Sequence, residues 1–189
     1  MKKLIGLYTL ILILSSACSK DALRSDLDDS RDAWLKFKKA NNNSYSYTAT
    51  FGSWAGFSTT TTIVVMNGIV SERIYKRYTI DGQTGQKKLD KSWTEDKSTL
   101  NTHPYEGAET WTLDEVYNRA NNVWLKADKD QNELYFEANN NGMISLCGYV
   151  PKNCADDCLV GIRISEIKPL VGGKYIAVKL PSLYAPNGL

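Results

Sequence analysis

The chain has 189 residues, of which 42% are hydrophobic and 23% charged, and its 23 basic residues exceed its 21 acidic residues by two. This length fits one domain of ordinary size that can bury a core of its own. The charge is nearly balanced and no block of lysine or arginine occurs, so we expect no nucleic-acid partner.

Residues 1–17 have the layout of a bacterial lipoprotein signal peptide. Lys2 and Lys3 are followed by an apolar run from Leu4 to Leu14, and small residues then precede Cys18. The run is shorter than the roughly 20 residues that a transmembrane helix needs. We therefore expect cleavage before Cys18 and a membrane anchor made of fatty acyl chains, such as palmitate, on that cysteine.

The residue after the cysteine indicates the membrane to which a lipoprotein is sorted. Ser19 stands there instead of an aspartate, which by the lipoprotein sorting rules favours the outer membrane of the bacterial envelope. Cleavage also removes Lys2 and Lys3, so the mature chain is neutral and the basic excess belongs to the signal. The alternative is an ordinary cleaved signal in which Cys18 has no special role.

After a lipidated tether at 18–25, we predict a single domain over residues 26–189. Ser25 and Asp28 resemble an N-cap pair, and apolar residues then recur at helical spacing up to Asn41-Asn42-Asn43. This pattern predicts an amphipathic helix over Asp26–Ala40 whose core-facing residues are Leu27, Trp34 and Phe37.

Three strands are predicted next. Ser44–Phe51 alternates strictly, with Tyr45, Tyr47, Ala49 and Phe51 on one face. Thr59–Met66 and Ile69–Ile80 flank Asn67-Gly68, which accepts the positive φ angles of a type I′ turn and so predicts a hairpin. The third strand places Val70 and Ile74 on one face and Ser71, Arg73 and Arg77 mostly on the other.

Residues 81–111 form an insert in which the hydrophobic periodicity fails while glycine, proline and mixed charges accumulate. Compact domains seldom leave so long a segment unstructured. We expect this insert to hold a short hairpin or to be functional.

The second half repeats the order of helix and strands. Thr112 to Glu115 has the sequence of a capping box and opens a helix that carries Leu113, Val116, Tyr117, Ala120 and Trp124 on one stripe. Strands are predicted at Glu133–Ala138, Met143–Tyr149, Leu159–Lys168 and Tyr175–Leu180. The fold class is therefore α+β, an antiparallel sheet with two helices packed on one face, and the order also fits two similar helix-plus-meander halves.

One succession of residues resembles an uncharacterised family of bacterial lipoproteins, classified as a domain of unknown function. It comprises Trp34, Tyr45-Ser46-Tyr47, the hairpin from Ile63 to Val70, Leu113-Asp114-Glu115, Leu134 to Glu137, and Gly142-Met143-Ile144. The resemblance spans Ser30 to Lys168 and implies no activity. The insert and the tail after Pro169 depart from the family's compact pattern.

Three cysteines lie in the exported domain, where disulfides are permitted. If Met143–Tyr149 pairs with Leu159–Lys168, Cys147 and Cys158 come close enough to bridge, and a link from Cys154 to Cys158 is the main alternative. Three reduced thiols form another alternative. A structural zinc normally takes four ligands, so we expect no metal site.

Catalytic machinery is not indicated. His103 is the single histidine, it lies in the insert, and no G-x-S-x-G motif occurs. Carboxylate pairs at Asp156-Asp157 and at Glu133 and Glu137 are more typical of loops and solvated faces than of acid and base catalysis or calcium binding. We expect no catalytic residue and no cofactor.

Aromatic residues outside the regular patterns remain as binding candidates. Trp54 lies between Gly52 and Gly56, and Trp93 lies in the insert, as does the third candidate, His103. Exposed, these rings would stack on sugars or anchor a protein; buried, they would close the ends of the core. We expect a non-catalytic envelope lipoprotein that binds a protein or another macromolecule through the insert and the Trp54 loop, with carbohydrate binding as the alternative and an uncharacterised enzyme third.

Overall fold

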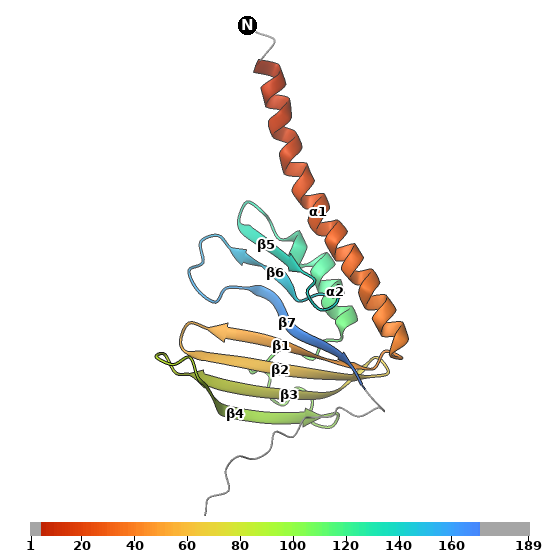
Figure 1. Ribbon diagram of the computed structural model, residues 1–189, viewed down its shortest axis with the longest axis vertical. Helices are drawn as coiled ribbons and strands as arrows, with labels where there is room; N and C mark the ends of the chain where they lie inside the picture. The colour runs from red at the N-terminus through yellow and green to blue at the C-terminus, as the bar shows by residue number, and fades with distance from the viewer. Residues whose placement is uncertain (1–4, 171–189) are drawn as a thin grey trace, which may run out of the picture.

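The computed structural model describes the backbone of residues 5–170 and the side chains of residues 22–170. Within that range two α-helices, one 3-10 helix and seven antiparallel strands form the fold, and the strand order across the sheet is β4-β3-β2-β1-β7-β6-β5 (Figure 1). The predicted α+β class is confirmed. The elements are α1 (Ile5–Ala40), β1 (Tyr45–Ser53), β2 (Phe57–Met66), β3 (Ile69–Ile80), β4 (Lys87–Asp96), α2 (Leu113–Asn122), η1 (Trp124–Lys126), β5 (Asn132–Glu137), β6 (Leu146–Pro151) and β7 (Val160–Pro169).

The first helix is much longer than predicted. α1 runs from Ile5 without a break, so the start predicted at Asp26, with Ser25 as N-cap, is wrong. No glycine or proline lies between Leu7 and Ala40, and nothing in the segment predicted as a tether interrupts the helix. The side chain of Cys18 lies outside the described side chains.

The rest of α1 follows the prediction. Leu27 and Trp34 are buried, and Phe37 packs against the same core. The helix ends where the asparagines begin, because Asn42 and Asn43 adopt positive φ angles of 49° and 51° that a helix does not continue.

The hairpin predicted at Asn67-Gly68 is confirmed. β2 and β3 pair through Met66 and Ile69, and the two loop residues Asn67 and Gly68 have φ angles of 52° and 81°, as a type I′ turn requires. The buried face of β3 is the polar one, however, since Ser71 and Arg73 are buried there.

The insert contains a strand, β4, which pairs with β3 along its length and forms one edge of the sheet. Its ten residues, Lys87 to Asp96, carry several charges and little apolar alternation because an edge strand needs few buried side chains. The remainder of the insert, residues 97–111, is a loop without helix or strand. The predicted strand Tyr175–Leu180 lies outside the described residues.

The second helix begins with the predicted capping box. The Thr112 hydroxyl accepts from the Glu115 N–H, and the Glu115 carboxylate accepts from the Thr112 N–H. Both helices share one core with strands β1, β2, β6 and β7. Its members include Leu27, Trp34, Tyr45, Tyr47, Ile63, Leu113, Val116, Tyr117, Trp124, Ile144 and Ile164.

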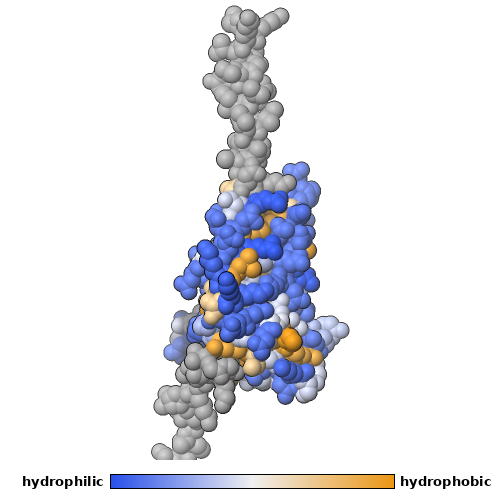
Figure 2. Space-filling model, turned by 90° about the vertical axis from the view of Figure 1, so that its right-hand side faces the viewer, coloured by the Kyte–Doolittle hydropathy of each residue, from blue (hydrophilic) through white to orange (hydrophobic). Residues whose placement is uncertain are grey.

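The outside of the helical side is hydrophilic. Figure 2 shows this side, and charged and polar side chains dominate it with apolar ones scattered among them.

Candidate functional site

β7 changes its pairing partner in the middle of its length. Residues 160–163 pair with β6, whereas residues 164–169 pair with β1, and no β7 residue pairs on both sides. On β1 the pairing with β7 stops at Ala49, so residues 50–53 pair with β2 alone. The sheet therefore forks between β1 and β7 (Figure 1).

A cavity of about 720 Å³ lies in this fork. Its edges are β1 residues 49–52 and β7 residues 161–163, and its walls are the insert loop at 105–108 and the loop at 154–159 that precedes β7. We call it the fork groove. Its volume falls within the range of roughly 300–1,000 Å³ that is usual for ligand sites.

Aromatic and charged side chains line the fork groove. Phe51 is 44% exposed there, and Tyr105, on the insert loop, is 98% exposed. The Arg77 guanidinium lies 4.5 Å from the centre of the Phe57 ring and 3.4 Å from the Asp90 carboxylate. Exposed rings beside a cation are typical of binding surfaces.

A disulfide fixes one wall of the fork groove. Cys154 and Cys158 are joined, so the predicted bridge between Cys147 and Cys158 is wrong and the alternative is confirmed. Cys147 on β6 is a buried free thiol opposite Ile162, and burial raises its pKa to about 12. The wall is also tied to β1, because the Ser53 hydroxyl donates a 2.6 Å hydrogen bond to Asp157.

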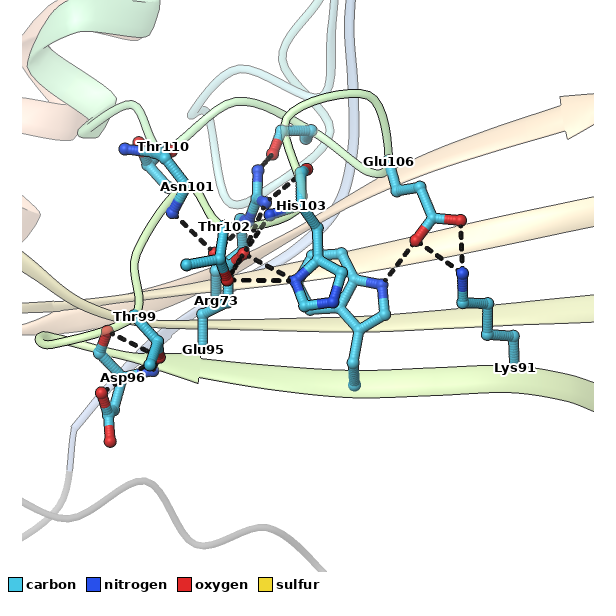
Figure 3. Close-up of polar contacts among 12 residues, drawn as sticks. Arg73, Lys91, Glu95, Asp96, Thr99, Asn101, Thr102, His103, Glu106 and Thr110 are labelled. Carbon is cyan, nitrogen blue, oxygen red and sulfur yellow. Dashed lines mark hydrogen bonds and ion pairs between the residues drawn. The ribbon is translucent and has the colours of Figure 1, made fainter.

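A buried carboxylate fixes the opposite wall. Glu95 on β4 is fully buried and accepts two hydrogen bonds from the Arg73 guanidinium, at 2.9 and 3.0 Å (Figure 3). Its remaining lone pairs accept from the loop: from the N–H groups of Asn101 and His103 and from the hydroxyl of Thr102. A single carboxylate thus holds β3, β4 and the start of the insert loop together.

The protonation state of this carboxylate follows from its donors. Burial alone would raise the pKa of Glu95, but the hydrogen bonds from Arg73 and His103 outweigh burial and lower it to about 2. The ionised carboxylate can only accept hydrogen bonds. The Nδ1 of His103, 2.9 Å away, therefore carries a proton and donates a hydrogen bond to Glu95. Arg73 also donates to the backbone carbonyls of His103 and Ala108.

Trp93 extends the same cluster towards the fork groove. Its ring stacks between Tyr75, at 4.9 Å, and His103, at 4.2 Å, and its Nε1 donates to Glu106. Lys91 donates to both oxygens of Glu106, and these contacts lower the pKa of that carboxyl (Figure 3). The insert loop is thereby fastened to the sheet on the groove side.

The structure brings two of the three binding candidates together. Trp93 and His103 are stacked in the cluster that supports the insert loop, whereas Trp54 is 77% exposed at the turn between β1 and β2, next to the groove-lining Gly52. Sequence reasoning missed Arg73 and Glu95. Only the cross-strand register, which pairs Arg73 with Glu95, reveals them, and the hairpin expected in the insert had been given no position or partner strand.

The two carboxylate pairs considered from the sequence lie on different segments, one on β5 and one in the loop before β7. Glu133 and Glu137 share the exposed face of β5 with Tyr135, whose hydroxyl donates to Glu133. Asp156 and Asp157 lie in the disulfide loop and line the fork groove. In the described part of the chain no three His, Cys, Asp or Glu side chains converge to hold a metal ion.

The chemistry available around His103 is limited. Its ring nitrogen Nδ1 faces Glu95 and Thr102, and within residues 22–170 no serine or cysteine side chain is hydrogen-bonded to the ring. A histidine oriented by a carboxylate resembles half of a nucleophilic triad, but the nucleophile is the part that performs the attack. The arrangement is suited to holding a loop.

Comparisons with known proteins added no relatives. No family model, no curated protein and no solved structure matched the chain significantly. Among the residues that the structure describes, neither α-helix has the length and apolar character needed to cross a bilayer.

Proposed function

We propose that this chain is a membrane-anchored lipoprotein of the bacterial envelope that binds another macromolecule in the fork groove without catalysing a reaction. One observation carries the binding proposal: a groove of about 720 Å³ opens in the middle of the sheet between two loops that a disulfide and a buried carboxylate hold in place. Rigid walls lower the ordering cost of binding, which favours a recognition site.

The lipoprotein part of the proposal rests on the first 19 residues. The cleavage and acylation signal before Cys18 and the serine at position 19 support an anchor in the outer membrane. With them, the motifs from Trp34 to Ile144 support membership of the uncharacterised lipoprotein family that the sequence resembles.

We also infer that the two helices serve one face of the sheet. Trp34 of α1 donates to Asp114 of α2, and Ser30 hydrogen-bonds to the Tyr117 hydroxyl, which supports packing of the helices against each other above the same core. Each helix precedes one antiparallel meander, β1 to β4 or β5 to β7, and this order supports two similar halves.

The anchor is tested by labelling cells with a clickable palmitate analogue and separating membrane from soluble fractions. The full chain should carry the label and partition into detergent, and Cys18→Ala should lose the label and keep its leader. Ser19→Ala is the matched control and should still be acylated. A Cys18→Ala product of unchanged size, label and fraction would contradict the proposal.

Binding in the fork groove is tested with a photoreactive phenylalanine analogue placed at Phe51 or Tyr105. Irradiated envelopes should give a discrete adduct from these groove positions. The control position is Tyr135, which is similarly exposed but lies on β5, outside the groove. Equal adducts from Tyr135, or turnover of an envelope substrate that is lost in His103→Ala, would contradict non-catalytic binding in the groove.

Carbohydrate binding is the second candidate, because Trp54 and Tyr105 are highly exposed and Tyr105 lines the fork groove together with Asp156. Trp54 and Tyr105 have the exposure that sugar stacking needs, and the Asp156 side chain makes no hydrogen bond or ion pair with any described residue. A glycan array should then show binding that Trp54→Ala weakens at least tenfold. An array that stays silent for the unaltered chain removes this candidate.

A further inference from the structure

Two unpaired strand edges border the fork groove. Residues 50–52 of β1 pair with β2 on one side only, and residues 160–163 of β7 pair with β6 on one side only. Within the described chain no other backbone segment hydrogen-bonds to either run. Because alternate residues of a strand direct N–H and C=O groups to the same edge, each run presents main-chain donors and acceptors towards the groove.

These inner edges lack the protection that the outer edge has. β4, the edge strand at one side of the sheet, carries Lys87, Lys88, Asp90 and Lys91, and such charges discourage the addition of another strand. The fork edges, by contrast, are uncharged from Thr50 to Gly52, and Arg163 is the single charged residue of the 160–163 run. An unprotected edge is a template for strand pairing.

The groove has room beside these edges. It encloses about 720 Å³, and a β-carbon added to Gly52 would meet no atom within 4 Å. Its lining includes four aromatic rings, those of Phe51, Phe57, Tyr75 and Tyr105. Since side chains alternate along a strand, every second side chain of an added strand would contact these rings.

We propose that the fork groove receives an extended polypeptide segment of another envelope protein, which adds as a strand between β1 and β7. This proposal rests on the proposed function and specifies its partner. A polypeptide main chain supplies alternating donors and acceptors at strand spacing to both edges, whereas a sugar or a flat protein surface does not. We expect the bound segment to carry apolar side chains at alternate positions.

The experiment uses the full chain in detergent and a displayed library of random dodecapeptides. The best peptide is resynthesised in two N-methylated forms, one phase with N-methyl groups at the odd-numbered residues and the other phase with them at the even-numbered residues. A scrambled peptide serves as control. We expect the parent peptide to bind and both N-methylated forms to bind at least tenfold more weakly, because each phase removes donors to one edge. Hydrogen exchange should slow at residues 50–52 and 160–163 on binding, and Phe51→Ala should bind more weakly while Tyr135→Ala does not.

Several results would overturn strand addition. One is a library that yields no peptide binding more tightly than the scrambled control. Another is unchanged binding of both N-methylated peptides. A third is slowed hydrogen exchange only at segments other than residues 50–52 and 160–163. In a further outcome, residues 50–52 are protected from hydrogen exchange in the free chain and lose this protection when residues 171–189 are deleted. This result would show that the chain's own end, and not another protein, pairs with the β1 edge. Adducts from Phe51 and Tyr105 in the envelope would still support the proposed function if the peptide fails, so the two failures are distinguishable.

Discussion

Gly148 on β6 and Gly161 on β7 face each other so closely that neither position has room for a side chain. A β-carbon on Gly148 would stand 2.7 Å from the Val160 carbonyl oxygen, and one on Gly161 would overlap the backbone of Cys147. The contacts are with backbone, which cannot move aside as a flexible side chain can. This close pairing directs the first part of β7 towards β6 and away from β1.

Gly161→Ala should therefore destabilise the domain by about 2–4 kcal/mol, because it forces β6 and β7 apart. The measurement is the free energy of unfolding from urea titration. Gly52→Ala is the matched control, since its β-carbon meets nothing within 4 Å, and it should change stability by less than about 0.5 kcal/mol. Equal effects of the two substitutions would show that the close pairing is not needed.

Glu95→Gln should destabilise the domain by about 3–5 kcal/mol, because it leaves the buried Arg73 guanidinium without its counter-charge. Glu166→Gln, which alters the exposed pair with Lys168, should cost less than about 1 kcal/mol. Hydrogen exchange at residues 101–108 should accelerate in Glu95→Gln alone. An unchanged exchange rate there would contradict the role of Glu95 in holding the insert loop.

Stability should also fall in acid through the same carboxylate. The folded pKa of Glu95, about 2, lies below its ordinary value of 4.5, so its contribution is fully present above about pH 5 and is lost as the pH falls towards 2. The difference in unfolding free energy between the unaltered chain and Glu95→Gln should shrink over this interval. A difference that stays constant from pH 6 to pH 2.5 would contradict the lowered pKa.

Alkylation should distinguish the three cysteines of the domain. Cys154 and Cys158 should resist iodoacetamide until reduced, and Cys147 should react only after denaturation, because its thiol is buried and its pKa is raised to about 12. Peptide mapping without reduction measures this directly. A Cys147 that reacts in the native chain would show that β6 opens.

Replacing both Cys154 and Cys158 with serine should lower the unfolding free energy by about 2 kcal/mol, the chain-entropy value for a loop of this length. The loop should lose order locally while β1 to β4 keep their protection from exchange. The control is Cys147→Ser, which places a hydroxyl in the core and should destabilise the core strands instead. Loss of protection throughout the sheet on removal of the disulfide would contradict a local role.

Local patterns were sufficient for much of the fold. The Asn67-Gly68 turn, the capping box at Thr112 and the helical spacing of Leu27 and Trp34 are decided by residues close in sequence, and each is confirmed. The bounds of β4 and its pairing with β3 could not be predicted, because an edge strand buries few side chains and its sequence lacks the alternation that reveals inner strands.

The candidate site depends on contacts between distant segments, and the sequence does not show them. Arg73 was assigned to the polar face of its strand, and only the partnership with Glu95 makes that face a buried one. The fork between β1 and β7 has no signature either, because it arises where pairing stops at Ala49 and not from any motif. The place of Trp54 between two glycines left its exposure open, and the structure shows that it is exposed.

The position of β7 also determines when the domain can be completed during synthesis. This strand is the last of the described chain and the one connection between the two meanders, with Pro169 paired to Tyr45 near the other end of the sequence. Contacts so distant along the chain form slowly because a long loop must close first. A nascent chain therefore cannot complete the sheet until β7 has been synthesised.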